Sequence, residues 1–511
     1  MFEGRVGKGY LIVSGTGMFV KNPFIADDDI ENYYLNLFAL GCGEQDFGKY
    51  EKVVLPVPSF KQGLVPYDGT DPYWENNIYN DGASLDLWCD GNGDGASMAE
   101  CACALTSASM VMNYHGVERS PGGVFPQNPA YLNFFANELF PDLNGGEKGF
   151  FGGSFNWHYA ENFSADSAEF NDNKKVEFAS RENFSADRVK ELIDEDKPVI
   201  VNVTGKWGEH WLVVKGYDVG TGRLIINDPA LPDPPVGQYS YLAENYTPNE
   251  IGSMIVYQKT SSDFRRLQFA TSSLNQILVV DSLGNKTGFD PQDGFFNEIP
   301  NSDYSLDKYY GDATSTEDLL PATEGIHFLT ISLPEDGKYG LEVFSQNGEP
   351  HPVQVYSSDT EGKLAGKVLE PNSTEVGYNA IYLEDSAGEE INVSLSAQID
   401  ITPFIDSNVI IPFKWMPVGV AVLASDSFDV EKVDADSLTF GKTGDEESLK
   451  FCLQKLVDVN RDGKEDLLCY FYADKTGLYS EDTEAILKGI YDGFPFEGMD
   501  SVKVFKPSFL F

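Results

Sequence analysis

The spacing of apolar residues changes near residue 257, and this change constrains the fold more than any other feature of the sequence. From about residue 50 up to that point, helical and strand periods alternate along the chain. Beyond it, short apolar runs such as 326–333 and 339–343 are separated by turn residues such as those of 334–337. Short runs between turns are typical of antiparallel β-sandwiches.

A chain of 511 residues is long enough for roughly three domains. We expect boundaries near residues 265 and 400. The expected parts are an N-terminal segment of unassigned role at 1–50, an α+β domain at 51–265, an acidic β-sandwich at 266–400 and a β-module at 401–511. The predicted fold class is therefore multidomain, with one α+β domain followed by two mainly antiparallel β-sandwich domains.

Charge and apolar content exclude several classes of protein. The sequence has 81 acidic and 36 basic residues, so it lacks the clustered Lys and Arg that bind nucleic-acid phosphates. Its apolar content of 41% suffices for packed cores and excludes global disorder. No apolar run approaches the roughly 18 residues of a membrane span. Residues 1–5 do not resemble the start of a signal peptide, so a signal for export would lie outside this numbering.

A helix with a cysteine in its first turn is predicted at residues 102–116. Leu105, Ala108 and Met112 fall on one face at helical spacing, and Gly116 is placed to end the helix. Cys103 then lies where unpaired backbone N–H groups and the helix dipole stabilise a thiolate, the nucleophilic form of cysteine. A small buried cysteine on a helix is also a common core residue, so both interpretations stay open.

A thiolate nucleophile needs an imidazole partner, and the chain has 5 histidines. His115 would lie about 18 Å from Cys103 along the same helix and cannot pair with it. His210 begins an apolar strand, and the hairpin that follows ends at Asn227 and Asp228. A polar side chain thus returns beside His210 and can orient its ring. A purely structural strand histidine is the alternative.

Three segments, taken in order, resemble the bacteriocin-processing-peptidase-like family, a family 39-like group of papain-like cysteine peptidases. The segments are 103–116, 197–201, and 210–218 with 227–229, and the resemblance covers about residues 54–260. It implies a papain-like fold with Cys103 as the nucleophile and His210 as the general base and acid. It also implies Asp228 as the residue that orients His210, with Asn227 as the alternative.

The family also has a glutamine before the nucleophile, whose side-chain amide helps to bind the oxyanion. The segment 56–62 resembles this part of the family and implies Gln62, which lies 41 positions before Cys103. Ala104 and Leu105 stand where the family usually has Gly-Pro. These departures motivate an alternative, a calcium-stabilised surface or adhesion protein that binds peptide or glycan without cleaving it. An amidase or acyl transferase using the same triad is a further alternative.

Two loops have the oxygen spacing of calcium sites, and calcium is the only cofactor we expect. In the more complete loop Gly463 provides the turn, and Lys464 stands where such loops use a main-chain carbonyl oxygen. The predicted ligands of this loop are Asp458, Asn460, Asp462, Lys464 and Asp466. Those of the other loop are Asp90, Asn92 and Asp94, and a turn without an ion is an equal alternative there.

The residues around the 458–466 loop resemble a C-terminal β-module of many secreted bacterial and archaeal proteins. Cys452 and Cys469 flank this loop and could pair, as could Cys89 and Cys101, which leaves Cys42 over. The alternative is that all of these cysteines are free and buried. The sequence thus predicts an extracellular or cell-surface cysteine peptidase with a peptide or protein substrate and structural calcium. Its β-domains would provide contacts to a cell surface or matrix.

Overall fold

The structure is a computed structural model of the chain. It describes the backbone of residues 2–6, 9–14 and 17–21, and residues 52–63, 79, 97–138, 149–151, 154–205, 208–260, 263–308, 325–371, 373–389, 391–405, 407–414 and 416–505. In these ranges no helix is both long enough and apolar enough to cross a membrane. The first three strands, β1 (Phe2–Val6), β2 (Gly9–Ser14) and β3 (Gly17–Lys21), form an antiparallel sheet.

The described residues form two compact units. Most of the first unit is Met1–Phe135 with Ser167–Thr260, and the second consists of Ala136–Asp166, Ser261–Tyr309 and Leu320–Phe511. The second unit therefore includes a segment that interrupts the first unit in the sequence. The boundaries near residues 265 and 400 stay predictions.

The main part of the first unit is a seven-stranded antiparallel sheet together with several helices. The strands lie in the order β11-β10-β9-β8-β12-β7, and β4 pairs with β9. The strands are β4 (Lys52–Val54), β7 (Lys175–Asn183), β8 (Val199–Gly205), β9 (Gly208–Asp218), β10 (Leu224–Asn227), β11 (Ser240–Tyr241) and β12 (Ile251–Thr260). The α-helices are α2 (Met98–Cys101), α3 (Cys103–Tyr114), α4 (Pro129–Glu138, which continues into the second unit), α6 (Ala186–Asp194) and α7 (Leu242–Asn245), and the 3-10 helices are η2 (Ala168–Phe170) and η3 (Pro248–Glu250).

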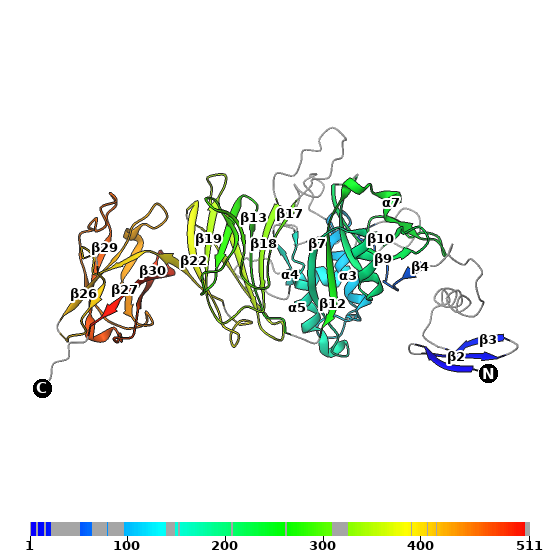
Figure 1. Ribbon diagram of the computed structural model, residues 1–511, viewed down its shortest axis with the longest axis horizontal. Helices are drawn as coiled ribbons and strands as arrows, with labels where there is room; N and C mark the ends of the chain where they lie inside the picture. The colour runs from blue at the N-terminus through cyan, green and yellow to red at the C-terminus, as the bar shows by residue number, and fades with distance from the viewer. Residues whose placement is uncertain are drawn as a thin grey trace. The chain divides into compact units, whose positions relative to one another are not determined.

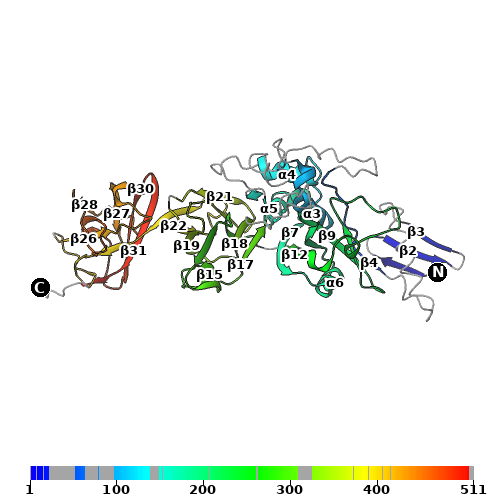
Figure 2. The same ribbon diagram turned by 90° about the horizontal axis from the view of Figure 1, so that it is seen from above.

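Helix α3 is buried along most of its length and lies along one face of this sheet (Figures 1 and 2). Small side chains let it approach strand β9, and the Ser107 hydroxyl donates a hydrogen bond to the Trp211 carbonyl oxygen at 3.1 Å. The chain then turns at Gly116, whose φ of +92° lies in the left-handed region that favours glycine. The predicted helix with Cys103 in its first turn is therefore confirmed.

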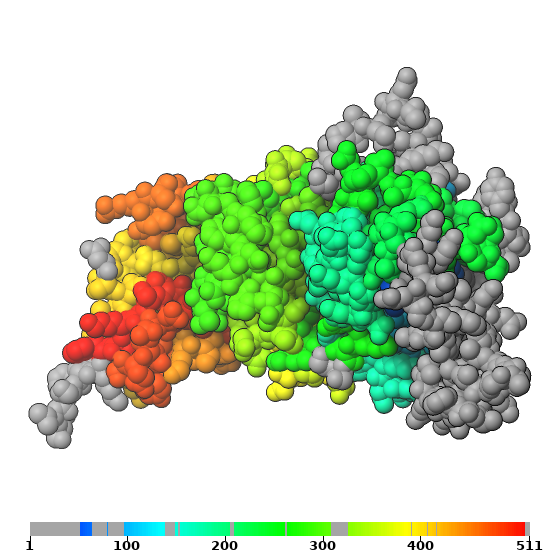
Figure 3. Space-filling view, turned by 45° about the vertical axis from the view of Figure 1, so that its right-hand side comes forward, coloured from blue at the N-terminus to red at the C-terminus, as the bar shows by residue number. Residues whose placement is uncertain are grey.

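The second unit is a sandwich of antiparallel sheets followed by further strands. The five-stranded sheet, in the order β17-β18-β13-β20-β21, contains β13 (Arg266–Ser272), β17 (Ser302–Lys308), β18 (Gly325–Ser332), β20 (Val353–Ser358) and β21 (Leu364–Leu369). A nine-stranded sheet faces it and shares its apolar core, in which Phe269, Ile277 and Leu329 are buried together. The strands of this sandwich belong to the part coloured green to yellow-green in Figure 3.

The nine-stranded sheet runs from the middle region of the sequence into the C-terminal region. Its order is β16-β15-β14-β19-β22-β23-β31-β30-β27, and β23 pairs with β31 in parallel. Its strands are β14 (Asn275–Val280), β15 (Lys286–Asp290), β16 (Gly294–Asn297), β19 (Gly337–Ser345), β22 (Glu375–Tyr382), β23 (Asn392–Ala397), β27 (Val433–Gly441), β30 (Glu484–Tyr491) and β31 (Phe494–Ser501). One apolar core extends across both regions. The structure is thus α+β with large β-rich regions, as the sequence predicts.

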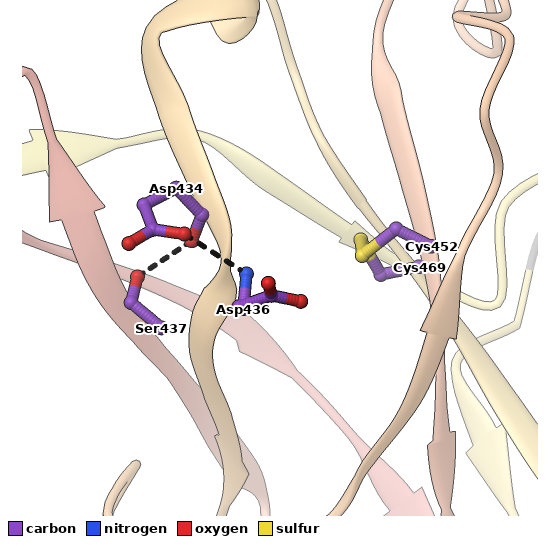
Figure 4. Close-up of a disulfide and its surroundings, with 5 residues drawn as sticks. All are labelled: Asp434, Asp436, Ser437, Cys452 and Cys469. Carbon is purple, nitrogen blue, oxygen red and sulfur yellow. Dashed lines mark hydrogen bonds between the residues drawn. A yellow bond between two sulfur atoms is a disulfide. The ribbon is translucent and has the colours of Figure 1, made fainter.

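The C-terminal region contains a disulfide between Cys452 and Cys469 (Figure 4). These cysteines face each other on paired strands of a smaller sheet, in the order β24-β26-β29-β28. Cys101 is disulfide-bonded as well, whereas Cys42 and Cys89 lie outside the described residues.

The remaining elements of the second unit are α5 (Tyr159–Asp166), β5 (Phe150–Phe151), β6 (Ser154–Phe155), β24 (Ile399–Ile401), β25 (Val409–Ile410), β26 (Pro417–Val422), β28 (Leu449–Cys452), β29 (Leu467–Tyr472), β32 (Lys503–Val504), η4 (Val430–Lys432) and η5 (Ala473–Lys475).

A buried polar network ties the α5 segment to strand β13 inside the second unit. Arg266 donates hydrogen bonds to the carboxylate of Glu161 and, at 2.6 Å, to Oδ1 of Asn162. The same carboxylate bonds His158 Nδ1 at 2.8 Å. Nearby, Asn156 donates to Oε1 of Gln268 at 2.8 Å. Because a charge left unpaired in a protein interior is costly, these contacts fix the position of the segment.

We predict that Glu161→Ala lowers the free energy of unfolding of the second unit by about 3–5 kcal/mol, because the variant removes the Glu161 carboxylate from its contacts with the buried Arg266 guanidinium and the buried His158 ring. Denaturant unfolding followed by fluorescence measures the change. The double variant Glu161→Leu/Arg266→Met removes both charges and should recover most of the lost stability. Removing the solvent-exposed Glu389, which pairs with Lys363 of the same unit at 3.2 Å, is the control and should have a much smaller effect. Equal effects at Glu161 and Glu389 would contradict the prediction.

Candidate active site

Cys103 is the first residue of α3 and is the free cysteine of the described residues. Its side chain is partly buried, so a reagent or substrate has access to it. The N-terminus of a twelve-residue helix presents unpaired N–H groups and a partial positive charge, which favour a thiolate. The short helix α2 leads into this position, with Ser97 and Glu100 bonding each other as a capping box.

Strand β9 places His210 beside Cys103, and the loop after β10 places Asp228 on the other side of the imidazole ring. His210 Nε2 donates to Asp228 Oδ1 at 2.7 Å, and Cys103 lies close enough to the His210 ring to influence its pKa. Since Nε2 is engaged with the carboxylate, Nδ1 is the ring nitrogen left for the thiol. Both His210 and Asp228 are buried. The three predicted triad residues are therefore brought together in one chain of contacts.

The electrostatics of the pair follow from burial and from charge. Burial alone lowers the pKa of His210, but the Asp228 carboxylate, its hydrogen bond to the ring and the nearby Cys103 sulfur outweigh it and raise the pKa to about 10. Burial alone raises the pKa of Asp228, but the charge of His210 and the hydrogen bonds that the carboxylate accepts hold this pKa below its usual value. The site therefore favours a protonated imidazole beside an ionised carboxylate.

Asp228 has two further partners that the sequence did not indicate. The backbone N–H of Ala230 donates to Oδ1 at 2.9 Å, and the Tyr246 hydroxyl donates to Oδ2 at 2.8 Å. The Tyr246 ring lies nearly parallel to the His210 ring, with an interplanar angle of 25° and centroids 6.5 Å apart. Tyr246 belongs to no motif and follows Asp228 by 18 positions, so no signal in the sequence pointed to it.

The segment that contains Gln62, which follows β4, contacts both the α2 helix and the Asp228 loop. The Gln62 amide Nε2 donates to the Ala99 carbonyl oxygen at 2.8 Å, and its backbone N–H donates to Pro229 at 3.1 Å. Gln62 Oε1 is buried without a hydrogen-bond partner among the described residues. Gln62 thus contacts Ala99, which lies four positions before Cys103, although Gln62 itself is distant from Cys103 in the sequence.

Asn227, the alternative to Asp228 for orienting the histidine, makes different contacts. Its side-chain amide donates to the carbonyl oxygens of Val57 and Pro58, both at 3.1 Å. Lys61 adds a second link between the same segments, because its ammonium group donates to the Asp228 carbonyl oxygen at 3.0 Å. Asn227 and Lys61 therefore attach the Gln62 segment to the triad loop, and Asp228 is the residue in contact with His210.

The loop of residues 458–466 is closed by the side chains that were predicted as metal ligands. Asp458 Oδ2 accepts from the backbone N–H of Gly463 at 3.2 Å, and Asp462 Oδ1 accepts from that of Lys464 at 2.8 Å. Both oxygens of the buried Asp466 accept backbone N–H groups, and Asn460 bonds Asp462. Asp458 Oδ1 is buried and has no partner among the described residues.

In the part of the chain that the structure describes, no three His, Cys, Asp or Glu side chains converge as a metal-binding group. The other predicted loop, with Asp90, Asn92 and Asp94, lies outside the described residues.

Comparison with known proteins gave one family and several distant structures. Residues 94–254 match the Peptidase_C39 like family, and no curated protein matches the chain. Among solved structures, the chain is similar to an anomalous substructure of titin A168–A169 (8% identity, 48% of this chain and 96% of that chain, TM-score 0.13). It is also similar to a chimeric titin Z1Z2 carrying a decorin peptide (11%, 47% and 97%, 0.13) and to the ectodomain of mouse nectin-like molecule 4 (6%, 49% and 97%, 0.12).

TM-scores this low do not establish a shared fold, so these structures contribute nothing to the assignment. The family match, in contrast, spans the segment from before α2 to within strand β12 and contains Cys103, His210 and Asp228. It confirms the resemblance that the sequence motifs indicate. Residues 94–254 of this chain are a C39-like domain of the papain-like cysteine peptidases.

Proposed function

We propose that the first unit hydrolyses peptide bonds with Cys103, His210 and Asp228 as its catalytic triad. The observation that carries the proposal is the buried His210 ring, which is bonded to Asp228 and lies beside Cys103 at a helix N-terminus. An adhesion or binding domain would have no need of this arrangement. The C39-like match supports the same class of reaction.

The proposed reaction begins from a thiolate–imidazolium pair, in which His210 already holds the thiol proton of Cys103, and the thiolate sulfur attacks the carbonyl carbon of a peptide bond. As the tetrahedral intermediate collapses, His210 returns the proton to the departing amine, and the acyl group remains on the sulfur. Water then gives a proton to His210 and attacks the thioester, which releases the carboxylic acid and restores the thiol. Asp228 stays ionised throughout and stabilises the imidazolium.

We predict that wild-type protein hydrolyses a peptide library and that Cys103→Ala does not. His210→Gln should lower kcat/KM by about 10²- to 10⁴-fold, because proton transfer is lost. Iodoacetamide should label Cys103 at pH values well below about 8.5, where an ordinary thiol is protonated, and peptide mapping locates the label.

His351, a histidine of the second unit that bonds Asn347 at 3.0 Å, provides the matched control. His351→Gln should leave both hydrolysis and labelling unchanged. Slow labelling of Cys103 only near the pH of free thiols, together with no turnover of any peptide, would exclude the peptidase and favour a binding domain. Release of ammonia from glutamine side chains without peptide cleavage would instead identify an amidase.

We also propose that Gln62 supplies part of the oxyanion hole. A side-chain amide nitrogen carries two hydrogens, and the Ala99 carbonyl oxygen accepts only one of them. The second hydrogen is then available to the oxyanion, next to the backbone N–H of Cys103 at the helix N-terminus.

We expect Gln62→Ala to lower kcat by about 10²- to 10³-fold, because an oxyanion donor acts mainly in the transition state. KM should change little, and the labelling rate of Cys103 by iodoacetamide, which forms no oxyanion, should stay close to that of the wild type. Single-turnover hydrolysis and alkylation kinetics measure the two effects. If alkylation falls as far as hydrolysis, Gln62 holds the site together structurally and the proposed role is wrong.

We propose that the 458–466 loop binds calcium when the ion is present. The observation that favours an ion is the buried Asp458 Oδ1 without a partner among the described residues. Carboxylates such as that of Asp466 have about four lone-pair sites, so they can accept N–H groups and still contact an ion. The ion would be held by Asp458, Asn460, Asp462, the main-chain oxygen of Lys464, and Asp466, and would supply structural charge neutralisation only.

Calcium should therefore raise the melting temperature of the second unit, by an amount equivalent to about 2.7 kcal/mol at a concentration 100 times Kd. Calorimetry with and without a calcium chelator measures the shift, and equal magnesium tests selectivity. Asp462→Ala should abolish the response. Asp436→Ala, which changes an exposed aspartate of the same region (Figure 4), should retain it. A response that is unchanged in Asp462→Ala would place the ion elsewhere.

We propose an extracellular or cell-surface location for the protein. Among the described residues, Cys101, Cys452 and Cys469 are disulfide-bonded and Cys103 is free. Disulfides persist mainly in oxidising compartments. The strongly acidic composition suits such surroundings because it keeps the protein soluble at high concentrations of salt or calcium.

A further inference from the structure

Tyr246 lies beside both Asp228 and His210, the two residues proposed to act with the Cys103 thiol. Its hydroxyl donates to Asp228 Oδ2 at 2.8 Å, and its ring lies nearly parallel to the His210 ring. Tyr246 follows the short helix α7 and is itself 5% exposed. Burial and the neighbouring Asp228 carboxylate raise the pKa of Tyr246 well above its usual value, so the hydroxyl keeps its proton and remains a donor.

The geometry of the Asp228 carboxylate depends on having a donor for each oxygen. The last torsion of an aspartate side chain is broad and roughly two-fold, so rotamer preference does not fix the direction of the oxygens. Oδ1 accepts from His210 and from the backbone of Ala230. Oδ2 has Tyr246 as its partner among the described residues. With 2% of Asp228 exposed, water has little access to replace a lost donor.

We propose that Tyr246 is a positioning residue, whose hydroxyl fixes the Asp228 carboxylate so that Oδ1 faces His210 and the imidazole is held toward Cys103. This inference rests on the proposed peptidase function and extends it to a fourth residue. Without the hydroxyl, the buried Oδ2 lacks a partner, and the carboxylate rotates to share the donors of Oδ1. The imidazole then loses the alignment from which it takes and returns the thiol proton.

The hydroxyl and the ring of Tyr246 have separable effects. Tyr246→Phe removes the hydrogen bond and keeps an aromatic ring over the imidazole, whereas Tyr246→Ala removes both. Tyr217 offers a matched control in the same unit, because its hydroxyl donates to Asp194 Oδ1 at the same distance of 2.8 Å, on the protein surface and away from the triad. Tyr217→Phe therefore removes an equivalent tyrosine–aspartate hydrogen bond without touching His210.

The experiment compares the full-length wild type, Tyr246→Phe and Tyr217→Phe at one temperature, below the melting range of all three. We expect Tyr246→Phe to lower kcat by roughly 10- to 100-fold, the loss typical of a hydrogen bond to a charged group. KM should stay within about two-fold of the wild-type value, since no substrate contact is lost. The rate at which iodoacetamide alkylates Cys103 should fall as well. Tyr217→Phe should match the wild type in all three measurements.

A spectroscopic measurement tests the alignment itself. The proton on His210 Nε2, assigned by its loss in His210→Gln, should give a low-field NMR signal that shifts in Tyr246→Phe and not in Tyr217→Phe. If Tyr246→Phe does not fold, the tyrosines can be replaced with 3-fluorotyrosine, whose more acidic hydroxyl is a stronger hydrogen-bond donor. This replacement should also shift the NMR signal of the His210 Nε2 proton.

The outcomes separate this inference from the proposed function. Wild-type protein that cleaves no peptide, with an alkylation rate and NMR signal that still respond to Tyr246→Phe, overturns the peptidase and leaves the positioning role intact. Wild-type protein that cleaves peptides, with kcat, alkylation and the NMR signal unchanged in Tyr246→Phe, overturns the positioning role alone.

Discussion

The buried hydrogen bond between His210 and Asp228 is the interaction on which the geometry of the first unit depends. The bond is 2.7 Å long. It forms only when strand β9, the turn after strand β10 and the segment of residues 57–62 lie next to one another. Polar contacts of Asn227, Lys61 and Gln62 attach the segment of residues 57–62 to the turn after β10, and β10 pairs with β9. A buried ion pair gains little stability by itself. Its presence here, next to a partly buried thiol that a substrate can reach, is therefore better explained by chemistry than by folding.

Local patterns in the sequence were sufficient to predict the elements that carry the triad. The apolar spacing and Gly116 predicted helix α3, and the strand–turn–strand pattern predicted the hairpin that brings Asp228 back to His210. Both signals are short-range, since they depend on helical spacing or on a single turn. The family resemblance added Gln62, and the structure places this residue against the α2 segment that leads to Cys103. Its role as an oxyanion donor stays a proposal.

Long-range polar contacts could not be predicted in this way. Tyr246 donates to Asp228 from a loop that has no periodicity and no motif, so nothing in its neighbourhood distinguishes it from other tyrosines. The same is true of Arg266 and Glu161, which are 105 positions apart and meet only after two parts of the chain have folded together. The loop of residues 458–466 shows the opposite limit. Its ligand spacing is visible in the sequence, but the side chains of Asp458 and Asp462 bond the loop backbone in the structure, and three acidic groups do not converge.

The parallel pairing of β23 with β31 has a consequence for the synthesis of the chain. Strand β23 ends at Ala397, and its neighbour β31 begins at Phe494. While a ribosome makes the intervening residues, β23 is an open edge of an otherwise paired sheet, and open edges readily recruit strands from other molecules. Correct assembly of the middle sandwich therefore depends on how fast the C-terminal region emerges and docks. A stalled or truncated chain that ends before residue 494 would expose an adhesive edge where the complete protein has a continuous sheet.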